Sequence, residues 1–203
     1  AAKAADVIGL YLNPPEKAVV LSVDEKPSIQ ALERRRGYVQ TSSGKVVQGL
    51  QSTYKRHGTV NLFAALEVAT GVIRGKTTPT QKRADFQAFM AEVVADEPAD
   101  REIHVILDNL NTHQKNDEWL AAHPNVTFHF TPTSASWLNQ VEIWFGIFQR
   151  KTLRNASFSS VDQLVEAIHQ FTTAYNQNAA PFVWRKREVK GTQLRNTIVN
   201  LCN

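Results

Sequence analysis

The chain has 203 residues, of which 42% are hydrophobic and 21% charged, the composition of a soluble globular protein with one substantial core. No apolar run approaches the roughly 18 residues that a membrane-spanning helix needs, and Ala1–Tyr11 lacks the layout of a signal peptide. The single cysteine, Cys202, excludes internal disulfides and a cysteine-rich zinc site, so we expect a reducing, cytoplasmic setting.

The formal net charge of +4 is distributed unevenly. Residues 146–203 hold eight Lys or Arg against three Asp or Glu, whereas residues 1–145 hold fifteen against sixteen. A basic C-terminal third is what a phosphate-binding surface needs, but it also fits a solvated basic tail. Charge alone does not choose between these two interpretations.

The first half of the chain predicts a strand, a polar stretch and a hairpin. Ala18–Val23 is a nearly continuous apolar run that follows two prolines, typical of a buried central strand. Arg34–Lys55 is polar, so we expect a short strand around Lys45–Val47 with exposed loops beside it. Alternate residues in Thr59–Val68 are apolar, and Thr70-Gly71 supplies a turn, which together predict a hairpin.

Helices and strands alternate in the next part of the chain. Residues 86–94 carry apolar side chains at helical spacing and predict a helix that ends at Asp96-Glu97-Pro98. Ile103–Leu107 predicts a second buried strand. Lys115–Ala122 predicts a short helix before Pro124, and the alternation in Val126–Phe130 predicts a third core strand.

Two further helices complete the predicted fold. Ser134 and Ser136 are candidate N-caps for a long apolar helix over Trp137–Asn155, whose tryptophans we expect in the core. The capping box Ser160-x-x-Gln163 opens a last helix. The complete order is strand, hairpin, helix, strand, helix, strand, helix, helix. It predicts one α/β domain over residues 1–203, with a central mixed sheet flanked by helices.

Three carboxylates lie in unusually apolar surroundings. Asp24 and Asp108 each follow a buried run, and Glu142 is flanked by apolar side chains in its predicted helix. A desolvated carboxylate is costly unless it is paired or binds a cation. Each also has an ordinary interpretation: a turn cap for Asp24, an Asx-turn for Asp108 and a surface helix position for Glu142. The helix, strand and loop between Asp108 and Glu142 can return the chain to the same end of the sheet.

Three converging carboxylates suit Mg²⁺ or Mn²⁺, which prefer oxygen ligands. Two such ions roughly 3.5–4 Å apart can activate an attacking oxygen and stabilise the leaving oxygen of a phosphoryl displacement. Paired carboxylates without metal would indicate glycoside hydrolysis. The basic balance and the lack of a sugar-stacking aromatic pattern make that alternative less attractive.

Four segments carry a resemblance to a known family. They are VDEKP with Asp24, YKRHGTVNLFAALEVATG from residue 54, LDNLNTH with Asp108 and His113, and FTPTSASWLNQVE with Glu142. Together they resemble the mariner superfamily of DDE transposases, and most closely its bacterial insertion-sequence branch. Each piece alone is a weak signal, but their order and spacing are specific. The resemblance covers roughly residues 7–184.

The resemblance implies an RNase H-like fold and a catalytic triad of Asp24, Asp108 and Glu142 that binds two Mg²⁺ or Mn²⁺ ions. It implies nicking at transposon ends and attack by the freed 3′-OH on target DNA, usually at TA dinucleotides. Family members carry helix-turn-helix domains that read the terminal repeats, and none is expected in this chain. We therefore expect weak, salt-sensitive binding to double-stranded DNA, a homodimer on that DNA, and a bacterial cytoplasmic location at the nucleoid.

Further residues are weaker candidates. Asn109 and His113 match the family motif after the second aspartate, and His113 is expected to contact a scissile phosphate, to orient a carboxylate, or to be a structural histidine. Candidate DNA contacts are the polar residues before Glu142 and several basic side chains. They are Lys26, Lys55, Arg56, His57, Ser136, Asn139, Gln140, Arg150, Lys151 and Arg154. Ser136 also has helix capping as an alternative role.

Other functions fit the sequence less well. The four histidines from His104 to His129 do not form a His-x₃-His helical pair for zinc, and no Gly-x-Ser-x-Gly elbow supports a serine hydrolase. Two alternatives stay open within the expected fold. One is a DNA-binding or assembly module without activity, and the other is an RNase H-like nuclease that cleaves without joining strands.

Overall fold

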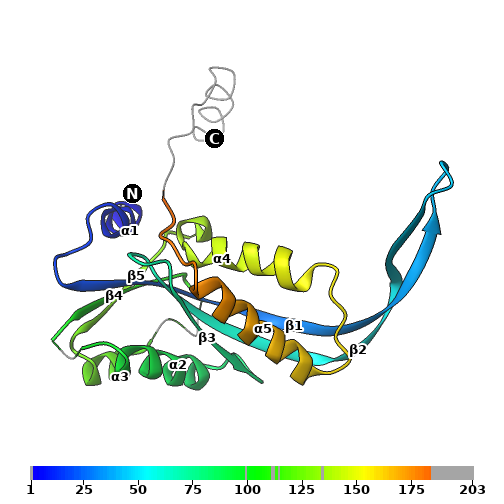
Figure 1. The fold of residues 1–203 in the computed structure, drawn as a ribbon. Coiled ribbons are helices and arrows are strands. Elements are labelled where there is room, and N and C mark those ends of the chain that lie inside the picture. Colours follow the sequence, from blue (N-terminus) through cyan, green and yellow to red (C-terminus); the bar gives the residue numbers. More distant parts are fainter. Residues whose placement is uncertain (1, 99, 111–112, 114, 134, 184–203) are drawn as a thin grey trace, which may run out of the picture.

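In a computed structural model of the chain, a five-stranded sheet is covered by helices on both faces (Figure 1). The structure describes residues 2–98, 100–110, 113, 115–133 and 135–183. The strands are β1 (Ala18–Gln40), β2 (Val46–Glu67), β3 (Ile73–Thr78), β4 (Glu102–Leu107) and β5 (Val126–Phe130). Their order across the sheet is β3-β2-β1-β4-β5.

The sheet is mixed, as the sequence predicts. The hairpin strands β2 and β3 pair antiparallel, and β2 pairs antiparallel with β1. The crossovers through helices make β4 parallel to β1 and β5 parallel to β4. This topology brings the carboxyl end of β4 beside the middle of β1, where Asp24 lies.

Five α-helices flank this sheet in the described part of the chain. Their bounds are α1 (Ala2–Leu12), α2 (Arg83–Ala95), α3 (Asp117–Ala122), α4 (Val141–Phe148) and α5 (Val161–Asn176). A 3₁₀ turn, η1 (Ser136–Leu138), precedes α4, and a π-helical turn, η2 (Gln149–Leu153), follows it. In this described part, no helix has the length and apolar character needed to cross a bilayer.

Two hydrophobic cores lie on the opposite faces of the sheet. Helices α4 and α5 cover one face, where Trp144 and Phe148 pack on Leu62 and Ile73. Helix α2 covers the other face, where Phe86 and Met90 are among the buried residues that pack on the strands. Helix α5 begins after the predicted N-cap Ser160, and its residues Leu164 and Ile168 are fully or almost fully buried.

Several expectations about the elements are wrong. The stretch Arg34–Lys55 does not form loops around a short strand, because β1 and β2 continue through it as a two-stranded arm that projects from the body (Figure 1). Asp24 therefore lies inside a long strand and not at a strand end. Where burial is described in this ribbon, most positions are exposed, so its sequence has little hydrophobic alternation to reveal it.

The helical segments differ in detail. Helix α1 was not expected, although Val7 and Leu10 bury its inner face against Val20 and Ile106. The long helix expected from Trp137 begins only at Val141. Trp137 is therefore not in the core but 65% exposed. Ser134, one candidate N-cap, lies outside the described residues.

The turn between β2 and β3 depends on Gly71. Its φ of +76° lies in the left-handed region, and a Cβ there would lie 2.1 Å from the carbonyl oxygen of Ala180. We expect Gly71→Ala to lower the free energy of unfolding by about 2–4 kcal/mol, through both strain and the clash. Gly44→Ala is the matched control, because Gly44 has φ +81° but open space around it. Denaturant unfolding that gave equal losses for both variants would contradict the packing argument.

Candidate active site

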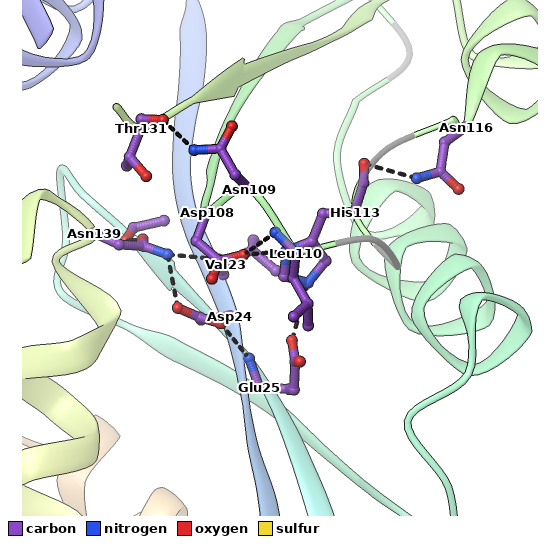
Figure 2. A network of polar contacts seen from close by, with 11 residues as sticks. Val23, Asp24, Glu25, Asp108, Asn109, Leu110, His113, Asn116, Thr131 and Asn139 are labelled. Atoms are coloured by element: carbon purple, nitrogen blue, oxygen red, sulfur yellow. Dashed lines mark hydrogen bonds and ion pairs between the residues drawn. The ribbon is translucent and has the colours of Figure 1, made fainter. Parts of the chain in front are cut away.

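Asp24 is a buried carboxylate on the face of β1 that α4 covers. Its side chain is 5% exposed. The backbone N–H of Glu25 donates to Oδ1 at 2.9 Å, and Asn139 Nδ2 donates to Oδ2 at 3.1 Å (Figure 2). Burial and the nearby negative charge of Asp108 raise the pKa of Asp24 to about 7. Two fixed donors thus orient a carboxylate that is costly to ionise without a cation.

Asp108 follows the last residue of β4, as the sequence predicts. Its Oδ1 accepts hydrogen bonds from the backbone N–H of Leu110 at 2.9 Å and from His113 Nδ1 at 2.8 Å. The hydrogen bond from Leu110 forms an Asx-turn, the ordinary interpretation of Asp108 from the sequence. Partial burial acts to raise the pKa of Asp108, but the bonds from His113 and Leu110 bring it below its usual value. Asp108 is therefore held ionised beside Asp24.

His113 joins two carboxylates inside the protein. The side chain has no exposed surface, and its ring packs on Phe86 of α2 at a centroid distance of 4.7 Å. Nδ1 contacts Asp108. Nε2 lies 2.9 Å from Glu25 Oε2 and forms an ion pair with it, although the angles do not fit a hydrogen bond. Burial alone would lower the pKa of His113, but the two carboxylates raise it to about 9. His113 is thus positively charged at neutral pH and positions Asp108.

Glu25 belongs to the site, although the sequence analysis did not single it out. It is buried, and donor atoms of Asp24, Glu25 and His113 lie within 4.8 Å of one another. A protonated His113 offers no lone pair to a metal, so this trio is better described as an ion pair beside Asp24 than as a ligand set. The signal that marked Asp24, an acid directly after a buried run, applied equally to its neighbour.

Glu142 occupies the first turn of α4 with its side chain at the surface. The apolar residues around it in sequence, Val141, Trp144 and Phe145, face the core instead. Burial raises the pKa of Glu142, the charge of Lys26 lowers it, and Asp108 and Glu25 raise it further. The start of α4, where Glu142 lies, is tied to β1 through Asn139, whose Nδ2 donates to Asp24 Oδ2. In the described structure, however, Asp24, Asp108 and Glu142 do not approach one another closely enough for one ion to contact all three.

A buried network ties the start of α4 to β1 (Figure 2). Asn139 Nδ2 donates to the carbonyl oxygen of Val23 at 2.9 Å, and Ser22 Oγ donates to Asn139 Oδ1. The N–H of Val141 donates to Ser22 Oγ at 2.9 Å, so a serine from the neighbouring strand caps this helix. Ser136 does not cap it, because the helix begins five residues later. The network therefore sets the position of Glu142 relative to Asp24.

Removal of Asn139 tests this network. We expect Asn139→Ala to lower the free energy of unfolding by about 2–3 kcal/mol, because Ser22 Oγ and Asp24 Oδ2 would lose buried partners. Asn125→Ala is the control, since Asn125 makes one exposed hydrogen bond to the carbonyl of Arg101. Its expected cost is below about 1 kcal/mol. Equal costs in denaturant unfolding would show that the buried network adds nothing.

The remaining sequence candidates fall into separate groups. Asn139 and Gln140 are buried, which does not agree with their interpretation as DNA contacts. Asn109 links the ends of β4 and β5 by donating to the carbonyl of Thr131. Ser136 is exposed, and His57 already pairs with Glu33 at 2.6 Å.

The basic candidates also divide by position. Lys26, Arg150 and Arg154 line one groove, whereas Lys151 does not. Lys55 and Arg56 are exposed on β2 and do not line that groove. The structure thus brings three of the expected basic contacts together in one groove, while Lys55, Arg56 and Lys151 do not line it.

Comparisons with known proteins agree with this geometry. The family described as "DDE superfamily endonuclease" matches residues 19–165. No curated protein matches the sequence. The crystal structure of the Mos1 strand transfer complex is similar with a TM-score of 0.63 at 14% identity, over 85% of this chain and 52% of that one. The chain thus spans about half the length of that relative, and the likeness confirms the expected RNase H-like fold.

A second solved structure is less similar. It is the cryoEM structure of the simian T-cell lymphotropic virus intasome in complex with PP2A regulatory subunit B56 gamma. The TM-score is 0.44 at 11% identity, over 78% of this chain and 58% of that one. A likeness at this level does not identify a fold.

Proposed function

The chain belongs to the DDE superfamily endonucleases, and on that premise we propose that it is the catalytic core of a DNA transposase. In this proposal Asp24, Asp108 and Glu142 hold the divalent cations. The observation that supports it is the buried Asp24 beside an ionised Asp108, with the start of α4, where Glu142 lies, tied to Asp24 through Asn139. The segments that resemble mariner transposases supply the reaction class.

The donor set fits Mg²⁺ or Mn²⁺. All three side chains offer carboxylate oxygens, which these hard cations prefer. Asp24 and Asp108 repel one another, and Asp24 is buried, so a divalent cation between them would relieve both costs. Two such ions, when bound, would activate the attacking oxygen and stabilise the leaving oxygen of a phosphoryl displacement.

The other residues position these carboxylates. The N–H of Glu25 and the amide of Asn139 fix the two oxygens of Asp24, leaving their remaining lone pairs for a ligand. His113 holds Oδ1 of Asp108, and among the described contacts Oδ2 accepts no hydrogen bond. Its charge is balanced by Glu25, so the site keeps its orientation without excess positive charge. This preorganisation is what a metal-dependent site requires.

The proposed reaction is hydrolytic nicking of DNA at transposon ends, followed by attack of the free 3′-OH on target DNA at TA dinucleotides. Double-stranded DNA is the proposed partner, and two chains on paired ends form the proposed homodimer. The proposal does not assign recognition of the terminal repeats to this chain. Lys26, Arg150 and Arg154 are the basic residues best placed to contact phosphates near the carboxylates.

A joining assay tests this proposal. A pre-nicked DNA end with a free 3′-OH and a target duplex would be incubated with the protein in Mn²⁺ and then in Mg²⁺. We expect metal-dependent joined product that is lost at least about 10³-fold in Asp24→Asn, Asp108→Asn and Glu142→Gln. Glu166→Gln, an exposed glutamate of α5, is the control and should retain activity.

Each other outcome favours a specific alternative. Metal-dependent cleavage without joining would indicate an RNase H-like nuclease. DNA binding without either product would indicate an inactive binding module. Product that persists in the three carboxylate variants would refute the assignment of the catalytic residues.

A further inference from the structure

A groove lined with basic side chains begins beside the carboxylates, and we propose that it binds a single strand of DNA next to the scissile phosphate. This inference rests on the proposed function. The groove has a volume of about 500 Å³ and lies between β1 and the segment that follows α4. Its four cationic side chains are Lys26, Arg34, Arg150 and Arg154.

The charge of the groove is not neutralised from within. No carboxylate lines it, and none of the four cations forms a salt bridge in the part of the chain that the structure describes. Arg34 Nε is buried and has no hydrogen-bond partner among the described residues. Four cationic side chains in one concave space, none of them in a salt bridge among the described residues, favour an anion with several phosphates.

The groove lies next to the candidate active site along β1. Lys26 lines its near end and follows Asp24 by two residues on β1. Residues two apart on a strand point to the same face of the sheet, so Lys26 lies on the face of β1 that carries Asp24. Two strand residues span roughly 7 Å, so a strand whose phosphate lies at the carboxylates would pass Lys26 within about one or two nucleotides.

The walls of the groove are fixed by hydrogen bonds before any ligand binds. The backbone N–H of Phe158 donates to the carbonyl of Leu32 at 2.8 Å. The N–H of Arg34 donates to Ser157 Oγ at 2.8 Å, and this hydroxyl donates back to the carbonyl of Arg34 at 3.1 Å. The segment after η2 is thus tied to β1, so binding would cost little ordering of the protein backbone.

The size of the groove favours one strand over a double helix. A volume of about 500 Å³ is in the range of a small-molecule site, roughly 300–1,000 Å³. Neutral polar side chains, among them Gln30, Gln149 and Asn155, line it beside the cations. They can donate to phosphates or bases without a fixed pattern, so we expect weak sequence preference, as in other single-strand grooves.

Binding measured without catalysis tests the groove. Fluorescence anisotropy in EDTA would compare a labelled single strand of about 12 nucleotides with the matching duplex. We expect the double variant Arg150→Gln/Arg154→Gln to bind the single strand about tenfold or more weakly. The slope of log affinity against log salt should fall by about 1.4, for two lost phosphate contacts. Lys151→Gln is the matched control, because Lys151 lies in the same turn but outside the groove.

Several results would overturn the inference. One is an equal loss in Lys151→Gln, which would mean that only overall charge matters. Another is an equal loss of duplex binding, which would mean that the face binds double-stranded DNA. If thermal unfolding shows that the double variant is not folded, Lys26→Gln provides the same comparison at the end of the groove next to Asp24. If strand joining fails while the groove still binds the single strand, only the proposed function is contradicted. If joining persists while the groove does not bind, only the role of the groove is contradicted.

Discussion

Asp24→Asn is expected to make the metal-free protein more stable at pH 8 while removing its metal response. In the folded protein, burial and the charge of Asp108 raise the pKa of Asp24 to about 7 from a usual value of 3.8. A raised carboxyl pKa means that the folded state binds the proton more tightly than the unfolded state. The free energy of unfolding of the wild type therefore falls progressively as the pH rises from about 4 to 7, and the full loss is present above pH 7.

The size of this effect has an upper bound. Three units of pKa correspond to about 4 kcal/mol. Asparagine removes the charge but can accept from only one of the two donors that now face Asp24, which returns part of the gain. We expect the variant to gain about 1–3 kcal/mol relative to wild type between pH 4 and pH 8, measured by denaturant unfolding in EDTA.

Added Mn²⁺ should then reverse the order. It should stabilise the wild type by about 2–3 kcal/mol at a hundredfold excess over the dissociation constant, and leave Asp24→Asn unchanged. Asp162→Asn, at an exposed position in the first turn of α5, is the control and should show neither effect. A variant that is less stable than wild type at pH 8 without metal would contradict the assigned cost of burying Asp24.

His113→Ala is expected to lower the free energy of unfolding by about 3–5 kcal/mol near pH 6, the cost of breaking a buried ion pair. It would leave Glu25 buried without its positive partner and open space against Phe86. The pKa of His113 is raised to about 9 in the folded state from 6.5. Its stabilising charge is therefore fully present below pH 6.5 and is lost as the pH rises through 9.

The pH dependence separates this ion pair from simple packing. The difference in stability between wild type and His113→Ala should shrink between pH 6.5 and 9, leaving only the packing loss. His123→Ala is the control: His123 stacks on Trp119 at a centroid distance of 4.0 Å, with no carboxylate partner among the described contacts. A cost for His113→Ala that does not change with pH would show that His113 is not charged in the folded protein.

The sequence predicted the apolar parts of the sheet strands and the burial of Asp24 because these depend on local patterns. The apolar runs before Asp24 and Asp108 indicate buried strands, so the acids that follow them are expected to be partly buried. The β2–β3 hairpin shows alternation of apolar residues and a turn signal at Gly71. These features need no knowledge of which residues meet across the sheet.

Other features depended on contacts between distant residues. Ser22 caps α4 from 119 residues away, so no helix-start pattern near Ser136 could reveal it. The pairing of Glu25 with His113 arises only when β1 lies beside the end of β4. The arm formed by β1 and β2 is held by backbone pairing between strands with little buried surface, which leaves almost no mark in the pattern of apolar residues.

The claim that the carboxylates hold a divalent cation is tested most directly by locating Mn²⁺. Crystals grown with Mn²⁺ would be measured at a wavelength at which manganese scatters anomalously. We predict an anomalous peak between the carboxylates of Asp24 and Asp108, with Glu142 reaching the same region. No peak at these carboxylates, or a single peak held by Glu25 and His113 away from Asp108, would contradict the account.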